Sequence, residues 1–384
     1  YALFPYYTDD KITESADITG NKSIFRIYKN NQEYKWEPLA VRSLGSYSTT
    51  QNLYKNRYGN KIIFEEVNHD LELTFRYQWS SSNAYGFVKK SKLINTGKEA
   101  VKVSLLDGIQ NIMPASIGSD EQNQSSNLVD AYKRNELEEA TGLGIFALSA
   151  ILVDKAEASE ALKANVVWSI GLNNPKHLLS SLQLNNFRLG NAVQQEVDVK
   201  AEKGAYFLNS DIILEKESAK EWMIIANVNQ NHSSIAKLSK QIKEDSSLID
   251  KVNNDINLGT KRLVELNSAS DAIQVTSDNL KDTRHFANTL FNIMRGGIFD
   301  NNYQIEKWDF KNYLEQANTK VAFTSEEIIE KLPEEFSLSD LQKIAYDNED
   351  KNFRRLCLEY MPLKFSRRHG DPSRPWNKFS INTR

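Results

Sequence analysis

The residues best suited to chemistry lie close together near the C-terminal end of the chain. Gly370, Pro372 and Pro375 interrupt this segment and prevent a regular helix, so we expect the side chains to project from a loop. Guanidinium and carboxylate groups can bind sugar hydroxyls in a bidentate way, and an indole ring can stack on a sugar ring. We therefore predict a sugar-binding loop, with an Arg–Asp ion-pair cluster that anchors a loop between helices as the alternative. The candidate residues are Arg367, Arg368, His369, Asp371, Arg374, Trp376 and Asn377.

The charge of the chain is distributed unevenly. Residues 351–384 hold nine Lys or Arg and two acidic residues, a net +7, which leaves −10 for the rest of a chain whose formal net charge is −3. Because this basic segment contains the predicted loop, it could form an anion site, phosphate included. A basic face that docks onto an acidic domain of the same chain explains the charge equally well. The near-zero total argues against bulk nucleic-acid binding and against a polybasic membrane module.

Other candidate residues carry weaker signals. Residues 107–114 are expected to end a strand and to form a structural loop with polar groups outward. Five scattered histidines lack metal-site spacing, and the single Cys357 excludes an internal disulfide framework. We expect no metal and no resident cofactor. Cysteine usage leaves the compartment open, with the cytoplasm slightly favoured over the periplasm.

The elements that must position these residues begin as strands. Residues 71–79 alternate between apolar and polar side chains, which predicts a strand with one buried face. Similar segments follow with turn residues between them, and only residues 135–141 suggest a short helix. Many strands without intervening helices predict a large antiparallel sandwich over residues 1–230. Within it, strand patterns place Trp79, Trp168 and Trp222 in the core.

Helical periodicity replaces strand alternation at about residue 231. From Ile235 to Leu266, apolar residues recur at spacings of three and four, with breaks at Asp245 and Gly259. This pattern predicts one long amphipathic helix, or two joined near Gly259. A helix lying across the sandwich is favoured over a coiled-coil dimer, because sustained heptads are absent.

The length of 384 residues fits two or three domains. We expect a β domain over 1–230, a helical linker over 231–300 and a helical segment over 301–384, where Thr324 and Ser337 cap helices. The longest apolar run is about half of a bilayer span, so no transmembrane helix is predicted. The chain starts without methionine and stops just after the predicted loop, so we expect a fragment of a longer protein.

Three stretches together resemble one known family. The resemblance to the N-terminal super-sandwich of family-94 glycoside phosphorylases rests on residues 93–97 leading to 103–114, and on residues 184–188 with 203–207. The stretch Arg-Arg-His-Gly-Asp-Pro-Ser-Arg-Pro-Trp-Asn at residues 367–377 is similar to one in large bacterial proteins described as cellobiose-phosphorylase-like. The order of strands, linker helices and further helices also fits that family.

The resemblance implies a galactose-mutarotase-like sandwich that precedes an (α/α)6 catalytic barrel. It implies an inverting glycoside phosphorylase or hydrolase acting on a di- or oligosaccharide, in which an acid protonates the glycosidic oxygen and phosphate or water attacks. Arg368 and Asp371 would bind the sugar, with Trp376 and Asn377 beside them. The catalytic acid would belong to the barrel and not to these 384 residues, and inorganic phosphate would be a co-substrate of a phosphorylase.

Two other functions stay open. The chain could be a carbohydrate-binding or mutarotase-like module that acts alone. It could also be a structural or dimerisation module, in which the helix over residues 235–266 pairs with a second chain. The expected partners are a carbohydrate, the rest of the same polypeptide and, as an option, a second copy; no nucleic acid or membrane partner is expected.

Overall fold

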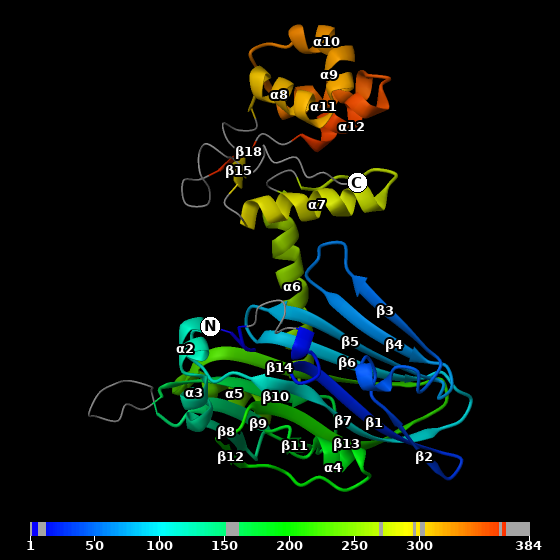
Figure 1. Ribbon diagram of the computed structural model, residues 1–384, viewed down its shortest axis with the longest axis vertical. Helices are drawn as coiled ribbons and strands as arrows, with labels where there is room; N and C mark the ends of the chain where they lie inside the picture. Colours follow the sequence, from blue (N-terminus) through cyan, green and yellow to red (C-terminus); the bar gives the residue numbers. More distant parts are fainter. Residues whose placement is uncertain are drawn as a thin grey trace. The chain divides into compact units, whose positions relative to one another are not determined.

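The computed structural model describes residues 2–6, 13–150, 161–268, 272–294, 297–299, 304–360 and 363–365. It divides into two compact units, Tyr1–Thr260 and Lys261–Arg384, called here the sandwich unit and the helical unit. The first is built mainly of antiparallel sheets and the second mainly of helices, which confirms the predicted fold class (Figure 1). The domain boundaries predicted at residues 230 and 300 stay a prediction.

Two antiparallel sheets form the sandwich unit. The smaller has the strand order β11-β13-β7-β1-β2, and the larger has the order β12-β8-β9-β10-β14-β6-β5-β4-β3. The strands of the smaller sheet are β1 (Gly20–Lys29), β2 (Gln32–Trp36), β7 (Val101–Ile112), β11 (Lys176–Leu178) and β13 (Gly204–Leu214). Those of the larger sheet are β3 (Thr49–Lys55), β4 (Ile62–Asn68), β5 (Leu73–Ser82), β6 (Gly86–Asn95), β8 (Lys133–Glu138), β9 (Leu143–Leu148), β10 (Lys163–Ile170), β12 (Asp198–Lys200) and β14 (Ala219–Asn231).

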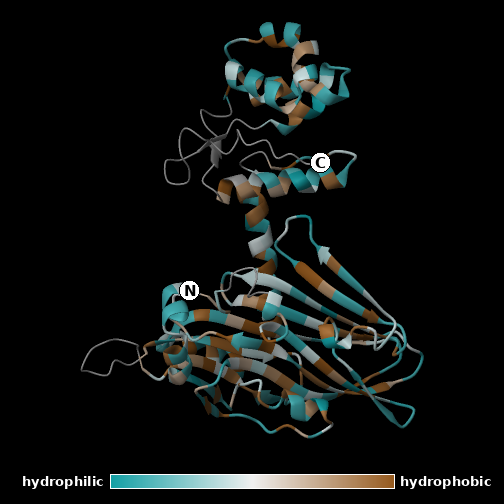
Figure 2. Cartoon of the chain, in the orientation of Figure 1, coloured by the Kyte–Doolittle hydropathy of each residue, from teal (hydrophilic) through white to brown (hydrophobic). Residues whose placement is uncertain are grey.

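The main core lies between the two sheets. Apolar and polar residues alternate along the strands (Figure 2), so each sheet turns one apolar face inward. On β5 the apolar face predicted from the sequence is buried at Leu73, Phe75 and Tyr77, and it packs on residues of the smaller sheet such as Phe25. Trp168 and Trp222 are buried, as predicted. Trp79 packs against the core but stays partly exposed, so the prediction that it lies in the core is only partly confirmed.

Two helices cover part of the outer face of the larger sheet. They are α5 (His232–Glu244) and α6 (Leu248–Ser268). Leu248, Val252 and Ile256 pack with Trp168 and its neighbours on β6, β9, β10 and β14, which confirms the predicted helix across the sandwich. This packing also uses the apolar stripe that a coiled-coil dimer would need. The break at Asp245 is confirmed.

The predicted break at Gly259 is wrong, because α6 continues through it. A glycine inside a helix costs only about 1 kcal/mol relative to alanine. The buried side chains Val252 and Ile256 on the preceding turns outweigh that cost.

The helical unit has its own core. Ile305, Phe310, Leu341 and Phe353 are among its fully buried residues. No helix of the described residues is long and apolar enough to span a membrane. The unit's elements are α7 (Asn279–Met294), β15 (Gly297–Phe299), β16 (Gln304–Glu306), α8 (Lys307–Ala317), α9 (Thr319–Thr324), α10 (Glu326–Glu330), β17 (Glu335–Ser337), α11 (Leu338–Asp347), α12 (Lys351–Glu359) and β18 (Leu363–Phe365).

One of the two predicted helix caps is confirmed. Ser337 accepts from the backbone N–H of Asp340, whose carboxylate accepts in return from the N–H of Ser337, so the pair forms a capping box. Thr324 instead ends α9, and its hydroxyl donates to the carbonyl of Val321. The prediction for Thr324 is wrong because Asn318 has already started a helix that reaches this residue.

The short helix predicted over residues 135–141 is also wrong. The strand β8 occupies most of that stretch, between β9 and β12. Lys133, Asn135 and Leu137 alternate with partly exposed neighbours, which is the period of a strand. Two of these inward residues are polar, and this hid the alternation in the sequence.

Candidate functional site

The residues predicted to form the sugar-binding loop lie outside the described residues. They are Arg367, Arg368, His369, Asp371, Arg374, Trp376 and Asn377. Their roles therefore stay predictions. Two polar clusters in the sandwich unit can be followed in atomic detail instead.

The first cluster surrounds Asp107, which is fully buried between the two sheets. The prediction of a loop from residue 107 is wrong, because β7 continues to Ile112 and Asp107 points into the core. Asp107 accepts four hydrogen bonds. The donors are Lys89 Nζ at 2.6 Å, Ser23 Oγ at 2.6 Å, Trp222 Nε1 at 2.7 Å and Ser91 Oγ at 3.0 Å.

These contacts join the two sheets. Asp107 and Ser23 belong to the smaller sheet, whereas Lys89, Ser91 and Trp222 belong to the larger one. Burial lowers the pKa of Lys89, and the charge of Asp107 opposes that effect. A carboxylate surrounded by four donors is a saturated acceptor, so it holds the sheets together and has no free oxygen for a substrate.

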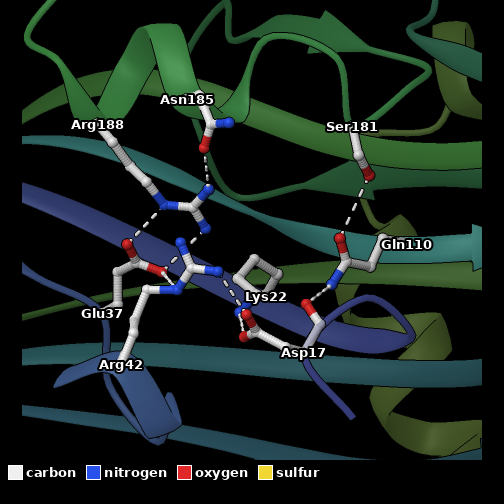
Figure 3. Close-up of polar contacts among 8 residues, drawn as sticks. All are labelled: Asp17, Lys22, Glu37, Arg42, Gln110, Ser181, Asn185 and Arg188. Atoms are coloured by element: carbon white, nitrogen blue, oxygen red, sulfur yellow. Dashed lines mark hydrogen bonds and ion pairs between the residues drawn. The ribbon is translucent and has the colours of Figure 1, made fainter. Parts of the chain in front are cut away.

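The second cluster lies on the outer face of the smaller sheet (Figure 3). Lys22 comes from β1 and points away from the core, because the inward face of that strand holds Phe25 and Ile27. The other members come from β7, from the short helix η1 (Val41–Ser43), from α4 (Leu184–Arg188) and from connecting segments. The members are Asp17, Lys22, Glu37, Arg42, Gln110, Ser181, Asn185 and Arg188, called here the outer-face cluster.

Ion pairs of alternating sign run through the outer-face cluster. Arg188 binds Glu37 through two bonds, Nε to Oε1 at 2.6 Å and Nη2 to Oε2 at 3.0 Å. Arg42 contacts Glu37 at 3.8 Å and also donates to Asp17, which accepts from Lys22 as well. Both carboxylates are therefore paired with cations.

Three neutral side chains complete the cluster. Asn185 Oδ1 accepts from Arg188 at 2.8 Å, and Gln110 donates to the carbonyl of Asp17 at 2.8 Å. Ser181 in turn donates to Gln110 at 3.2 Å. These bonds tie α4, η1 and the segment before β1 to the smaller sheet.

The electrostatics of Asp17 decide what the outer-face cluster can do chemically. Burial opposes ionisation of Asp17, but hydrogen bonds from Lys22 and Arg42 outweigh burial and hold the pKa of the carboxyl below its ordinary value. A general acid needs a raised pKa to keep its proton near neutral pH. Asp17 is therefore an anchoring carboxylate and is unsuited to protonate a leaving group.

Two neighbouring carboxylates on β4 support the edge of the larger sheet. Glu65 accepts from Asn52 at 2.9 Å, from Tyr54 at 3.0 Å and from Arg76. Glu66 accepts from Trp36 Nε1 at 2.7 Å and from Gln51 at 2.8 Å. Neither residue was predicted from the sequence, although two adjacent acids inside an apolar strand indicate internal partners.

No group of three or more His, Cys, Asp or Glu side chains within the described ranges could hold a metal ion.

Comparison with known proteins relates the helical unit to a family of carbohydrate-active enzymes. Residues 299–362 match insertion domain 1 of glycoside hydrolase family 149. Family 94 itself stays a resemblance. No curated protein matches the chain.

Among solved structures, the chain is similar to a bacterial glucoamylase complexed with acarbose, with 12% identity, a TM-score of 0.41, and 86% of this chain and 45% of that chain covered. It is also similar to a polysaccharide lyase, with 13% identity, a TM-score of 0.35, and 61% and 30% covered. A galactose mutarotase-like protein from Clostridium acetobutylicum has 9% identity, a TM-score of 0.25, and 58% and 83% covered. The chain spans less than half the length of the glucoamylase and the lyase.

Proposed function

We propose that the chain is a non-catalytic part of a carbohydrate-active enzyme, an inverting glycoside phosphorylase or hydrolase that acts on a di- or oligosaccharide. The observation that carries the proposal is the match of residues 299–362 to a glycoside hydrolase insertion domain. A large antiparallel sandwich and the three helices α5, α6 and α7 precede that domain. This order agrees with the resemblance drawn from the sequence, in which a catalytic barrel follows.

In this proposal the segment after residue 365 contacts the sugar. Arg368 and Asp371 bind hydroxyl groups in a bidentate way, and Trp376 stacks on the ring beside Asn377. The positive charge of residues 351–384 supports an anion site, and phosphate is the anion that a phosphorylase consumes. A hydrolase would instead need a second carboxylate to activate water.

Product analysis with and without phosphate tests the proposal. The longest natural polypeptide that contains this chain is incubated with di- and oligosaccharides, and sugar phosphate and free sugar are quantified separately. A phosphorylase yields sugar phosphate only when phosphate is present, whereas a hydrolase yields free sugar in both cases. Absence of both products for every donor would refute an enzymatic role.

Two variants separate the proposed sugar contacts from general damage. Asp371→Asn should raise KM for the sugar donor at least tenfold, since a charge-assisted hydrogen bond is lost. The matched control is Asp198→Asn, which removes a partly exposed carboxylate paired with Arg134 in the sandwich unit and should leave KM unchanged.

Calorimetry of the 384-residue chain with oligosaccharides should show weak binding or none, whereas a stand-alone binding module would bind tightly.

A further inference from the structure

Among the described residues of the sandwich unit, one long strand edge lacks the protection that free edges usually carry. β3 forms one end of the larger sheet, beside β4 (Figure 1). Its seven residues pair with β4 without a register shift, contain no proline and carry one charge, on Lys55. All of them except Asn52 are exposed. Edges of this kind are templates for pairing with another strand.

The other three edges of the two large sheets are short or charged. β11 and β12 have three residues each, and β12 carries Asp198 and Lys200. β2 has five residues and carries Glu33 and Lys35. Short length and charge are devices that prevent edge-to-edge association. β3 is seven residues long, and its first six residues carry no charge.

Hydrogen bonds at the two ends of β3 show which backbone groups face outward. His69 N–H donates to Ser48 C=O at 2.9 Å, and Asn56 N–H donates to Lys61 C=O at 3.1 Å. Both pairs continue the β3–β4 register, and hydrogen-bonded pairs alternate along an antiparallel ladder. The even-numbered residues therefore bond to β4. The odd-numbered ones direct their N–H and C=O groups to the free edge, and these are Thr49, Gln51, Leu53 and Lys55.

We propose that β3 is the interface with a second copy of this chain, formed by antiparallel pairing of the two β3 strands about a two-fold axis at Asn52. This register overlaps the whole strand. Thr49 of one copy lies opposite Lys55 of the other, and Gln51 lies opposite Leu53, so all outward backbone groups find partners. The two-fold symmetry satisfies both edges at once and closes the assembly.

The side chains of β3 favour the β3 strand of a second copy as the pairing partner. Leu53, which is 67% exposed, packs diagonally against Leu53 of the other copy. Lys55 meets Thr49, so like charges do not face each other. The strand is also fixed to β4 before pairing, because Asn52 and Tyr54 donate to Glu65 and Gln51 donates to Glu66. A preorganised edge loses little entropy when it pairs.

Backbone blocking at the outward edge gives the first test. Leu53→Pro removes an outward N–H and leaves the β4 pairing intact, because residue 53 bonds away from β4. Leu53→Ala keeps the donor and removes only the apolar contact. In sedimentation equilibrium of the 384-residue chain, we expect a wild-type dimer at tens of micromolar, a weakened dimer for Leu53→Ala and a monomer for Leu53→Pro. A monomeric wild type, or a dimer that Leu53→Pro leaves intact, overturns the proposal.

A cysteine pair tests the register and covers the case in which Leu53→Pro fails to fold. Asn52→Cys places two thiols on the symmetry axis, where they can form a disulfide between copies. Tyr54→Cys is the matched control, since it removes the neighbouring hydrogen bond to Glu65 but places its two thiols about 13 Å apart along the strands. Rapid oxidation to a dimer should occur at position 52 and not at 54. Equal crosslinking at both positions, or none at either, overturns the proposal.

Discussion

Replacing Asp107 with asparagine should destabilise the sandwich unit far more than any surface charge change. The side chain is fully buried, and its partner Lys89 is fully buried as well. Asparagine keeps the volume but removes the charge, and its amide nitrogen faces donors such as Ser91 and Trp222. Lys89 is then a buried cation without its counter-ion.

The expected loss follows from that uncompensated charge. Breaking a buried ion pair on one side costs about 3–5 kcal/mol of the free energy of unfolding. Asp198→Asn breaks a partly exposed pair with Arg134 and should cost at most about 1 kcal/mol. In the double variant Lys89→Met with Asp107→Asn, removal of the unpaired cation should recover part of the loss.

Urea unfolding followed by tryptophan fluorescence measures these differences, since Trp222 contacts Asp107 directly. A stability of Asp107→Asn within about 1 kcal/mol of the wild type, which is the range of a surface pair, would refute a strong buried ion pair. The losses of Lys89→Met alone and of Asp107→Asn alone should not simply add in the double variant, because residues in contact couple. Simple addition would refute the ion pair as well.

Three further changes test other parts of the fold. Burial lowers the pKa of His177 to about 4 from 6.5, against the opposing hydrogen bond of Gln195. Between those values the unfolded chain binds more protons, so stability should fall by about 3 kcal/mol as pH drops from 6.5 to 4, and His177→Gln should flatten this dependence in urea titrations. Ser337→Ala should lower the stability of the helical unit by about 1 kcal/mol in thermal unfolding, whereas Thr324→Ala, which removes no N-cap, should change it little. A Cβ on Gly108 would lie 2.2 Å from the carbonyl oxygen of Tyr206, so Gly108→Ala should cost about 2 kcal/mol or more in urea unfolding, and a neutral effect would contradict this close approach.

Periodicity predicts the parts of the fold where one apolar face meets the core. Residues 71–79 alternate because β5 buries one face, and the stripe from Ile235 onward exists because α5 and α6 cover a sheet. The pattern fails where polar residues point inward. Asn135 sits at an inward position of β8, and Asp107 sits at an inward position of β7, so both segments looked like something other than strands.

The polar clusters could not be predicted from the sequence, because their members are brought together by sheet topology. Asp107 meets Ser23 from β1 and Trp222 from β14, which lie in different sheets. Glu37 meets Arg188, 151 positions later in the chain. A single sequence holds no signal for such pairs. It does show which residues are polar inside apolar strands, and those are the positions that need partners.

The lowered pKa values of Asp17 and Glu65 indicate that these carboxylates have a structural role in the proposed enzyme and not a catalytic one. For Glu65, burial favours the neutral form, but hydrogen bonds from Asn52, Arg76 and Tyr54 outweigh burial and keep the pKa low. Both carboxylates therefore stay ionised as acceptors for neighbouring strands and loops. A glycosidic leaving group needs a carboxylic acid that holds its proton, which requires the opposite environment, an apolar pocket without donors. The proposed reaction must accordingly take its acid from outside these clusters, whose ionised carboxylates hold strands and loops of the sandwich unit together.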